Sequence, residues 1–330
     1  MAMSSESQRA PGRVPDFFVV GHHKSGTTAM YQMLRRHPQI YMPDMKEPEF
    51  FGRDLSRRAA AAASPDRRAP TYAQSRPRSY AEYLALFAAA EPDQRVGEAS
   101  PSYLASPSAA GAIAAVQPAA RIIAILREPA SFLHSLHLQM LRNHVQSEPD
   151  LAKAIAGEDV GCGGEGRHEY LGRVRYVEQL SRYHDVFSAE QVLVLIYDDF
   201  RSDNQTAIRS VLRFLDVDAE VPIRPVDANP SLAARSRALD RWSHALRTGR
   251  GPFSRGVKTT SKVLIPQRMR RRAISTIQRK VVYASAAAPE ESVMLELRKR
   301  FKPEVESLSE YLNRDLVALW GYDAVDPSSE

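Results

Sequence analysis

Cysteine and long apolar runs are both scarce in this chain of 330 residues. Cys162 is the only cysteine, which excludes an internal disulfide framework and fits a reducing compartment. No apolar run approaches the roughly 20 residues that a membrane-spanning helix needs. The first residues also lack the apolar core of a secretory signal. We therefore expect residues 1–15 to be a disordered leader and the protein to be cytoplasmic.

Apolar runs typical of buried strands alternate with helical patterns along most of the chain. Residues 16–21, 121–126 and 191–197 fit strands buried on both faces, and a shorter candidate surrounds Val96. Helical spacing of apolar residues predicts helices at 27–37, 79–90, 108–116, 130–143, 170–187, 291–301 and 305–320, the last two separated by Pro303. This alternation predicts an α/β fold with a parallel sheet covered by helices on both faces.

The first predicted strand leads into a turn and helix with the sequence GHHKSGTT, residues 21–28. Such a turn directs backbone N–H groups and the positive end of a helix toward an anion. Lys24 adds a charge, and Ser25, Thr27 and Thr28 add hydroxyl donors. Lys24 precedes Gly26, whereas the nucleotide triphosphatase pattern has its lysine after the second glycine. The loop therefore predicts a phosphate site of another kind.

The end of the strand at 121–126 also departs from the triphosphatase pattern. It finishes in Arg127, where an ATP or GTP site needs a carboxylate for magnesium. Parallel strands end at one edge of their sheet, so Arg127 should face the same crevice as Lys24. No metal-binding spacing of histidines is present in the chain, and we expect no metal.

These motifs resemble those of sulfotransferases that use 3′-phosphoadenylyl sulfate (PAPS), and the chain is similar to bacterial relatives of the carbohydrate and heparan types. The order KSGTT resembles the family's 5′-phosphosulfate loop, which implies cofactor contacts from Lys24, Ser25, Gly26, Thr27 and Thr28. The pair Arg127 and Ser135 resembles the family's 3′-phosphate site. The resemblance implies a P-loop-type sheet over residues 16–322, in a single domain with a basic helical lid insertion, followed by a tail at 323–330.

The acceptor side of the resemblance lies in two further stretches. KEPEFF, residues 46–51, is similar to the carbohydrate-type Glu-x-x-Phe-Phe stretch, which implies that Glu47 is the general base and that Glu49 faces the acceptor. GEASPSYL, residues 97–104, is similar to a family element with a lysine where this chain has Ala99. Either Lys46, a basic residue of the lid, or Lys24 alone must then supply that charge. Glu98 is the next candidate for the base and, with Glu49, a candidate for contact with the acceptor.

Positive charge is concentrated between Arg235 and Lys280, a segment that contains fourteen Lys and Arg residues and one acidic residue. That segment carries +13, while the whole chain carries +6, so the basicity is local and does not indicate nucleic-acid binding. We favour a lid or acceptor-side segment over a solvated insertion. A peripheral membrane contact through 235–280 is the third reading. Residues 54–78 predict a separate mobile insertion.

The resemblance implies transfer of a sulfuryl group to a hydroxyl or amine, with PAP released and Lys24 and Glu47 as catalytic residues. The acceptor stays open among glycans, lipids and secondary metabolites. Two rival functions also stay open. One is a kinase using ATP, and the other is a non-catalytic nucleotide- or polyanion-binding protein that keeps the fold.

Overall fold

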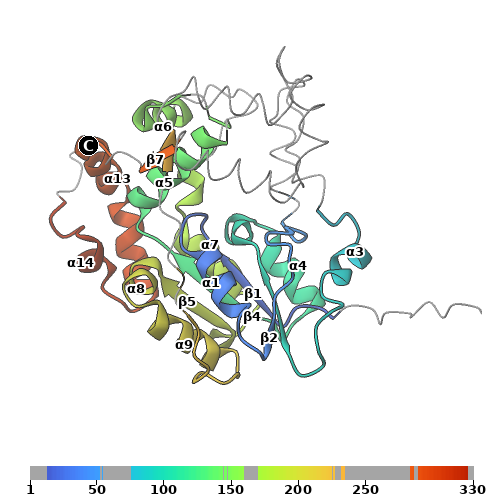
Figure 1. Ribbon diagram of the computed structural model, residues 1–330. Helices are drawn as coiled ribbons and strands as arrows, with labels where there is room; N and C mark the ends of the chain where they lie inside the picture. The colour runs from blue at the N-terminus through green and yellow to red at the C-terminus, as the bar shows by residue number, and fades with distance from the viewer. Residues whose placement is uncertain are drawn as a thin grey trace, which may run out of the picture. The chain divides into compact units, whose positions relative to one another are not determined.

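Five parallel strands form the central sheet in the order β2-β3-β1-β4-β5 (Figure 1). β1 (Phe17–Gly21) lies in the middle and pairs with β3 (Arg95–Ala99) and β4 (Arg121–Leu126). β2 (Ile40–Tyr41) and β5 (Val192–Ile196) form the two edges. Nearly every side chain of β1 and β4 is buried, as expected for strands covered on both faces. The parallel sheet predicted from the sequence is confirmed.

The computed structural model describes residues 13–52, 54, 76–143, 145–146, 148–159, 170–224, 226, 232–234, 283–285 and 289–325. Predictions for Cys162, for the basic segment 235–280 and for most of the insertion 54–78 lie outside the described residues. The helices are α1 (Thr27–Leu34), α3 (Tyr80–Ala85), α4 (Ala109–Val116), α5 (Pro129–Arg142), α6 (Leu151–Asp159), α7 (Tyr176–His184), α8 (Tyr197–Ser202), α9 (Asn204–Phe214), α13 (Glu291–Tyr311) and α14 (Leu316–Trp320), with 3₁₀ turns η2 (Pro101–Ala105), η3 (Leu171–Arg173) and η4 (Ala189–Gln191).

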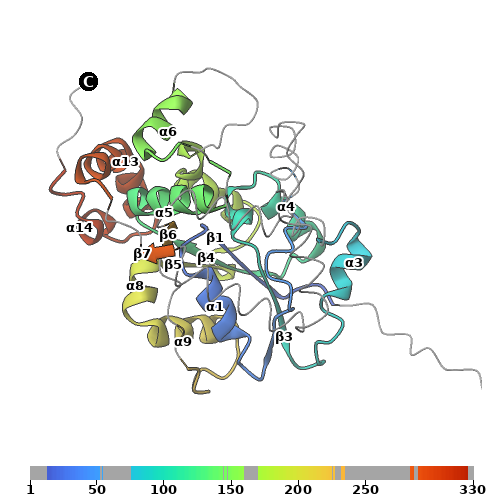
Figure 2. The same cartoon turned by 45° about the horizontal axis from the view of Figure 1, so that its top comes forward.

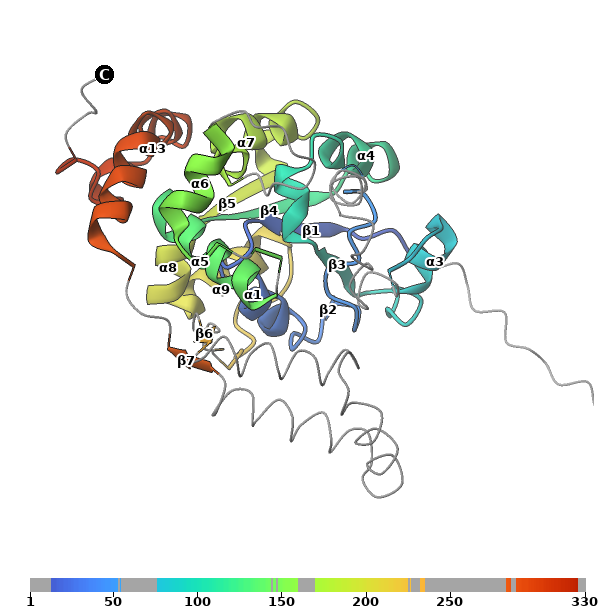
Figure 3. The ribbon, with the colours of Figure 1, turned by 90° about the horizontal axis from the view of Figure 1, so that it is seen from above.

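Helices cover both faces of this sheet, as Figure 3 shows, with α4 and α7 on one side and α1, α8 and α9 on the other. Alternate strand residues such as Val19 and Ile123 pack in one buried cluster with side chains of α1 and α9. Successive residues of a strand point to opposite faces. The residues on either side of Val19 and Ile123 in the sequence therefore face the helices on the other side of the sheet. The two-sided arrangement explains why the strands are apolar throughout.

The chain divides into two compact units. The first, Met1–Leu133 with Ala152–Asn229 and Ser292–Glu330, contains the parallel sheet. The second, His134–Leu151 with Pro230–Glu291, contains an antiparallel pair of short strands, β6 (Leu232–Ala234) and β7 (Tyr283–Ser285). No helix among the residues described above is long and apolar enough to cross a membrane.

The prediction of a helix break at Pro303 was wrong. α13 runs from Glu291 to Tyr311 with Pro303 inside it. Its buried residues recur at three- and four-residue intervals on both sides of the proline, and they are Met294, Leu297, Phe301, Val305 and Leu308. Packing of this uninterrupted apolar stripe outweighs the lost N–H and the ring clash, which cost about 3 kcal/mol or more in a helix interior.

The prediction of one helix over 170–187 was also wrong, because the structure has η3 and then α7 in that stretch. The backbone carbonyls of Gly172 and Arg173 both accept hydrogen bonds from the side chain of Gln179. His22 Nε2 lies 3.0 Å from the same Arg173 carbonyl. These two carbonyls therefore bind side chains of the site and not the backbone N–H groups of a continuous helix.

Candidate functional site

The predicted phosphate loop connects the end of β1 to the start of α1. Gly26 is the N-terminal cap of α1 and has a φ of 83°, and Lys24 has a φ of 68°. The first N–H groups of a helix have no partner within it, so the loop ends in a set of donors at the positive end of α1. Ser25 N binds the carbonyl of His22 at 3.3 Å, which closes the turn.

Two glycines are required by the close approach of neighbouring groups. A Cβ on Gly21 would lie 2.4 Å from the carbonyl oxygen of Ile125 in β4. A Cβ on Gly26 would lie 2.9 Å from the ring of Phe200 in α8, and the positive φ at this position disfavours any other residue. The loop is therefore pressed between β4 and α8 with no room for side chains at these positions.

Ser25 is fully buried, and its Oγ has no hydrogen-bond partner among the described residues. A buried hydroxyl usually has a partner, because an unmade hydrogen bond is costly. Thr27 is also buried, while Thr28 is partly exposed. A phosphate oxygen at the start of α1 would satisfy Ser25, so the loop fits the anion that the sequence predicted.

Arg127 extends from the end of β4 to this loop. Its Nη1 donates to the carbonyl oxygen of Lys24 at 2.8 Å, and its guanidinium lies 4.8 Å from the centre of the Tyr197 ring. Burial lowers the pKa of Arg127, although the group stays charged. Arg127 thus lies next to Lys24, as the sequence predicted, while the crevice that they should share stays a prediction. Ser135 is a buried residue of α5 within the second unit, so its pairing with Arg127 stays a prediction.

Residues 46–51, here called the base segment, follow β2. Glu47 and Glu49 have φ values of 62° and 51°. A non-glycine residue with positive φ is uncommon and persists only where its surroundings hold it. Two such residues, separated only by Pro48, indicate a segment shaped by its contacts.

Glu47 is surrounded by cationic and imidazole groups. Lys46 forms an ion pair with its carboxylate. Burial would raise the pKa of Glu47, but Lys46, then His23 and Arg76, outweigh it and hold this pKa below its ordinary value. Burial in turn lowers the pKa of His23 to about 4. Because His23 precedes Lys24, this electrostatic interaction indicates that the predicted base lies near the phosphate loop.

Glu49 pairs with Arg76, which lies at the far end of the predicted insertion. Burial raises the pKa of Glu49, and Arg76 only partly offsets this effect. Glu49 therefore lies in the same cluster as Glu47 but already has a partner from the protein. Its predicted contact with the acceptor stays a prediction.

Glu98 in β3 is fully buried. Ser100 Oγ donates to Glu98 Oε1 at 2.6 Å, and the hydroxyl of Tyr83 donates to Oε2. Burial raises the pKa of Glu98 to about 7. Both oxygens are thus used inside the protein, which argues against the contact with an acceptor that the sequence suggested.

His22 points away from the loop into the interior. Its ring packs between Phe132 and Tyr176, with ring centres 4.5 and 4.6 Å apart. Nε2 lies near the carbonyl of Arg173 and 3.2 Å from the side-chain oxygen of Gln179, so it carries the hydrogen. Burial lowers the pKa of His22 to about 3, and the imidazole is neutral. His22 therefore anchors the loop to the protein interior through its packing on Phe132 and Tyr176.

The sequence did not single out His23, Arg76 and Arg173 as members of one cluster. Arg173 acts electrostatically on both His22 and His23, yet it is 150 residues away along the chain from the second of these. In the sequence, only the two adjacent histidines of the loop, His22 and His23, indicated that such a cluster could form. In the part of the chain that the structure describes, no three His, Cys, Asp or Glu side chains are placed to hold a metal.

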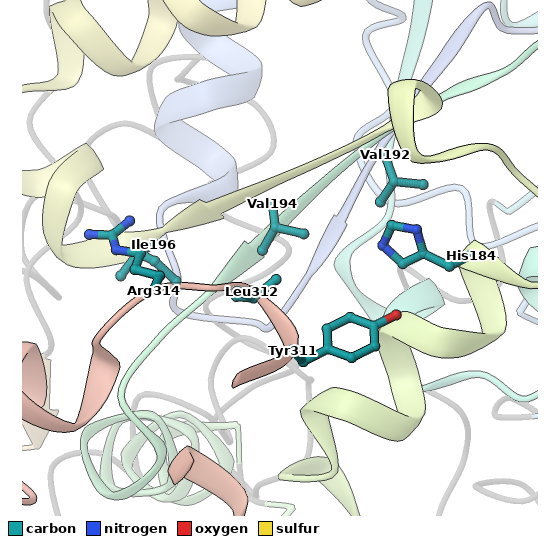
Figure 4. Close-up of a pocket in the computed structure, with 7 residues that line it drawn as sticks. All are labelled: His184, Val192, Val194, Ile196, Tyr311, Leu312 and Arg314. Atoms are coloured by element: carbon teal, nitrogen blue, oxygen red, sulfur yellow. The ribbon is translucent and has the colours of Figure 1, made fainter. Parts of the chain in front are cut away.

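A separate pocket of about 450 Å³ lies along β5 (Figure 4). Val192, Val194 and Ile196 line it from the strand, facing His184 and Tyr311. It contains none of the predicted site residues. The chemistry-bearing cluster is therefore the one around the phosphate loop.

Known proteins that are similar to this chain in sequence or structure include several sulfotransferases. A bifunctional heparan sulfate N-deacetylase/N-sulfotransferase 1 of Caenorhabditis elegans is 23% identical over 246 residues, which are 72% of this chain and 26% of that protein. Carbohydrate sulfotransferase 15 of Mus musculus is 24% identical over 255 residues, 62% of this chain and 44% of that protein. The chain therefore spans less than half the length of these relatives.

A solved structure of a sulfotransferase from Alicyclobacillus acidocaldarius has the same fold. It covers 93% of this chain and 98% of its own, with a TM-score of 0.64 and 23% identity. The model of the sulfotransferase family matches residues 15–221, which include the phosphate loop, the base segment, β3 and Arg127. This chain belongs to the sulfotransferase family.

Proposed function

We propose that the chain transfers the sulfuryl group of PAPS to a hydroxyl or amine acceptor and releases PAP. The observation that supports this most is the electrostatic interaction of Glu47 with His23, the residue before Lys24, since it indicates that a carboxylate lies near the phosphate loop. A base beside a phosphate cradle is what direct transfer to a protonated nucleophile requires.

On the donor side, Ser25 and the N–H groups at the start of α1 bind the 5′-phosphate. Lys24 neutralises the oxygen that bridges this phosphate and the sulfur, as preorganised electrostatics require. Arg127 binds the 3′-phosphate by its planar fork. The buried, unpartnered Oγ of Ser25 supports this assignment.

On the acceptor side, Glu47 takes the proton of the attacking hydroxyl or amine. A new bond forms from the acceptor atom to sulfur, and the bond from sulfur to the bridging oxygen breaks. The electron pair leaves with PAP, whose new charge Lys24 stabilises. Because the pKa of Glu47 lies below its ordinary value, the base is ready in its ionised form near neutral pH.

Lys46 is our candidate for the charge that the family places at the position of Ala99. Ala99 packs in the apolar cluster beneath α1, whereas Lys46 contacts the carboxylate of Glu47. A Lys46→Met variant should bind PAP normally and turn over slowly, and Lys46→Arg should restore turnover. Equal turnover in both variants would assign the charge elsewhere.

A kinase using ATP is less well supported, because the carboxylates that follow β4 and β5 are engaged elsewhere. Glu128 caps the start of α5 and accepts from the hydroxyl of Tyr322 at 2.7 Å. Asp198 accepts from the indole of Trp320 at 2.9 Å. Asp199 accepts two hydrogen bonds from Arg314, at 2.6 and 2.8 Å. None of these contacts directs a carboxylate toward Lys24, where a magnesium ion would need one.

The direct test is transfer of labelled sulfate from PAPS to a panel of acceptors without added metal. The names of the relatives given above refer to heparan sulfate and to carbohydrate. Sugars with free amino or hydroxyl groups are therefore tested first as acceptors, followed by lipids and small metabolites. Transfer that Glu47→Gln abolishes supports the proposal. Tight PAP binding with no transfer to any acceptor would favour the non-catalytic reading. The cytoplasmic location and the lid at 235–280 stay predictions.

A further inference from the structure

We propose that Glu98 is a positioning residue, which through Ser100 fixes the base segment, and hence Glu47, against the end of β3. The inference rests on the proposed function for the role of Glu47. It assigns a purpose to a buried carboxylate that the transfer chemistry does not use.

Three alternate N–H groups of the base segment bind the chain at and after the end of β3. Glu47 N donates to the carbonyl of Ala99 at 3.0 Å, and Glu49 N donates to Ser100 Oγ at 3.2 Å. Phe51 N donates to the hydroxyl of Tyr103 at 3.1 Å. Two of the three acceptors are side-chain hydroxyls, so the segment depends on how those hydroxyls are oriented.

Glu98 sets the orientation of the Ser100 hydroxyl. A hydroxyl has one hydrogen and two lone pairs. Ser100 gives its hydrogen to Glu98 Oε1 at 2.6 Å, so toward Glu49 N it can only accept. Without an acceptor at residue 98, that hydrogen could turn toward Glu49 N, where two donors would face each other. The acceptor oxygen Oε1 of Glu98, which remains available when Oε2 carries a proton, thus removes the wrong arrangement.

The second oxygen of Glu98 connects the same network to α3, which lies beside β3 (Figure 2). Tyr83 of α3 donates its hydroxyl to Glu98 Oε2. The ring of Tyr83 stacks on Phe50 of the base segment, with centres 4.7 Å apart and planes at 18°. Glu98 therefore fixes the base segment twice, through a hydrogen bond to its backbone by way of Ser100 and through the ring that packs on Phe50.

Hydrogen exchange of the full chain, followed by mass spectrometry on peptides that span residues 46–51, tests the inference. Ser100→Ala and Glu98→Met remove the acceptors and should speed exchange of this segment about tenfold. Glu98→Gln keeps a side-chain oxygen for Ser100 and should stay within twofold of the parent. Ser181→Ala, which removes a hydroxyl bonded to the Glu178 carbonyl in α7, is the matched control and should change nothing.

Two further readouts separate positioning from folding. PAP affinity should stay within twofold in every variant, because the hydrogen bonds of Glu98 and Ser100 given above involve no residue of the phosphate loop. The kcat for PAPS turnover should fall in Ser100→Ala and Glu98→Met with little change in the KM for PAPS, and it should recover in Glu98→Gln. Where Glu98→Met does not fold, Ser100→Ala decides.

Unchanged exchange of residues 46–51 in Ser100→Ala would overturn the inference. A loss in Glu98→Gln as large as that in Glu98→Met would overturn it as well, since the oxygen acceptor would then not be what matters. Failure of the parent protein to bind PAP would instead contradict the proposed function, while the exchange result would still decide the role of Glu98.

Discussion

Arg127 Nη1 donates a hydrogen bond to the carbonyl oxygen of Lys24 at 2.8 Å. This contact joins the end of β4 to the phosphate loop, at the lysine that we propose for the transfer. The hydroxyl of Tyr176 binds the Arg127 carbonyl at 2.8 Å, and the Tyr197 ring lies against the guanidinium. Arg127 is thus held from both sides before any nucleotide arrives.

Arg127→Lys should weaken PAP binding by about 10- to 100-fold, because lysine keeps the charge but loses the fork that binds loop and phosphate together. Isothermal titration with PAP measures this. Arg209→Lys on the exposed face of α9 is the control and should bind like the parent. Equal affinity in both variants would place the 3′-phosphate elsewhere.

Gly26→Ala should destabilise the fold by about 1–3 kcal/mol and abolish PAP binding, since the new methyl meets the Phe200 ring in a left-handed conformation. Gly111→Ala is the matched control. Gly111 lies in α4, a Cβ there would meet nothing within 4 Å, and the change should stabilise by roughly 0.5–1 kcal/mol. Urea unfolding of both variants checks the pair, and a tolerated Gly26→Ala would contradict the loop geometry described above.

Glu47→Gln should bind PAP as the parent does and lose about 10²- to 10⁴-fold in turnover, because the proton of the acceptor has no base to receive it. Single-turnover transfer from PAPS measures the loss. Glu310→Gln, at an exposed position of α13, serves as the control. Because the pKa of Glu47 is lowered, the parent should keep its activity below the ordinary pKa of a glutamate. Normal turnover by Glu47→Gln would mean that the base is another residue.

Glu98 should make stability depend on pH in a defined direction. Burial raises its pKa from 4.5 to about 7, with Ser100, Tyr83, Tyr103 and Glu49 as its neighbours. The folded state then holds a proton that the unfolded state releases, so the stabilisation is complete below about pH 4.5 and lost as the pH rises through 7.

Glu98→Gln cannot ionise and should escape this loss. Its free energy of unfolding, relative to the parent, should rise by about 3 kcal/mol between pH 4.5 and pH 8. Denaturant unfolding at several pH values measures the difference. A difference that stays constant across that range would mean that the pKa of Glu98 is not raised in the folded protein.

The donor side of the site could be predicted from the sequence because its residues are local or repeat a known spacing. Residues 21–28 follow a buried strand directly, and Arg127 ends the strand beside it, so the rule for parallel strand ends placed both at one edge. Three of the confirmed strands, β1, β4 and β5, contain runs of four or more apolar residues, whereas β3 contains Arg95 and Glu98.

The acceptor side could not be predicted in the same way, because its contacts depend on distant partners. Arg76 pairs with Glu49 from a stretch whose composition indicated only an insertion. The burial of Glu98 follows from Tyr83 and Ser100 packing on it, which no periodicity in the chain reveals. The helix break predicted at Pro303 was wrong for a related reason, because the tertiary packing of α13 outweighed the local effect of the proline.

Binding of PAP without metal tests the central claim most directly. Thermal stabilisation should be measured with PAP, adenosine 5′-phosphosulfate, ATP and ADP, each with EDTA and with magnesium. We predict that PAP stabilises the protein most, equally well in EDTA, and far more than the 5′-phosphosulfate that lacks the 3′-phosphate. Stabilisation by ATP that requires magnesium and exceeds that by PAP would contradict this prediction.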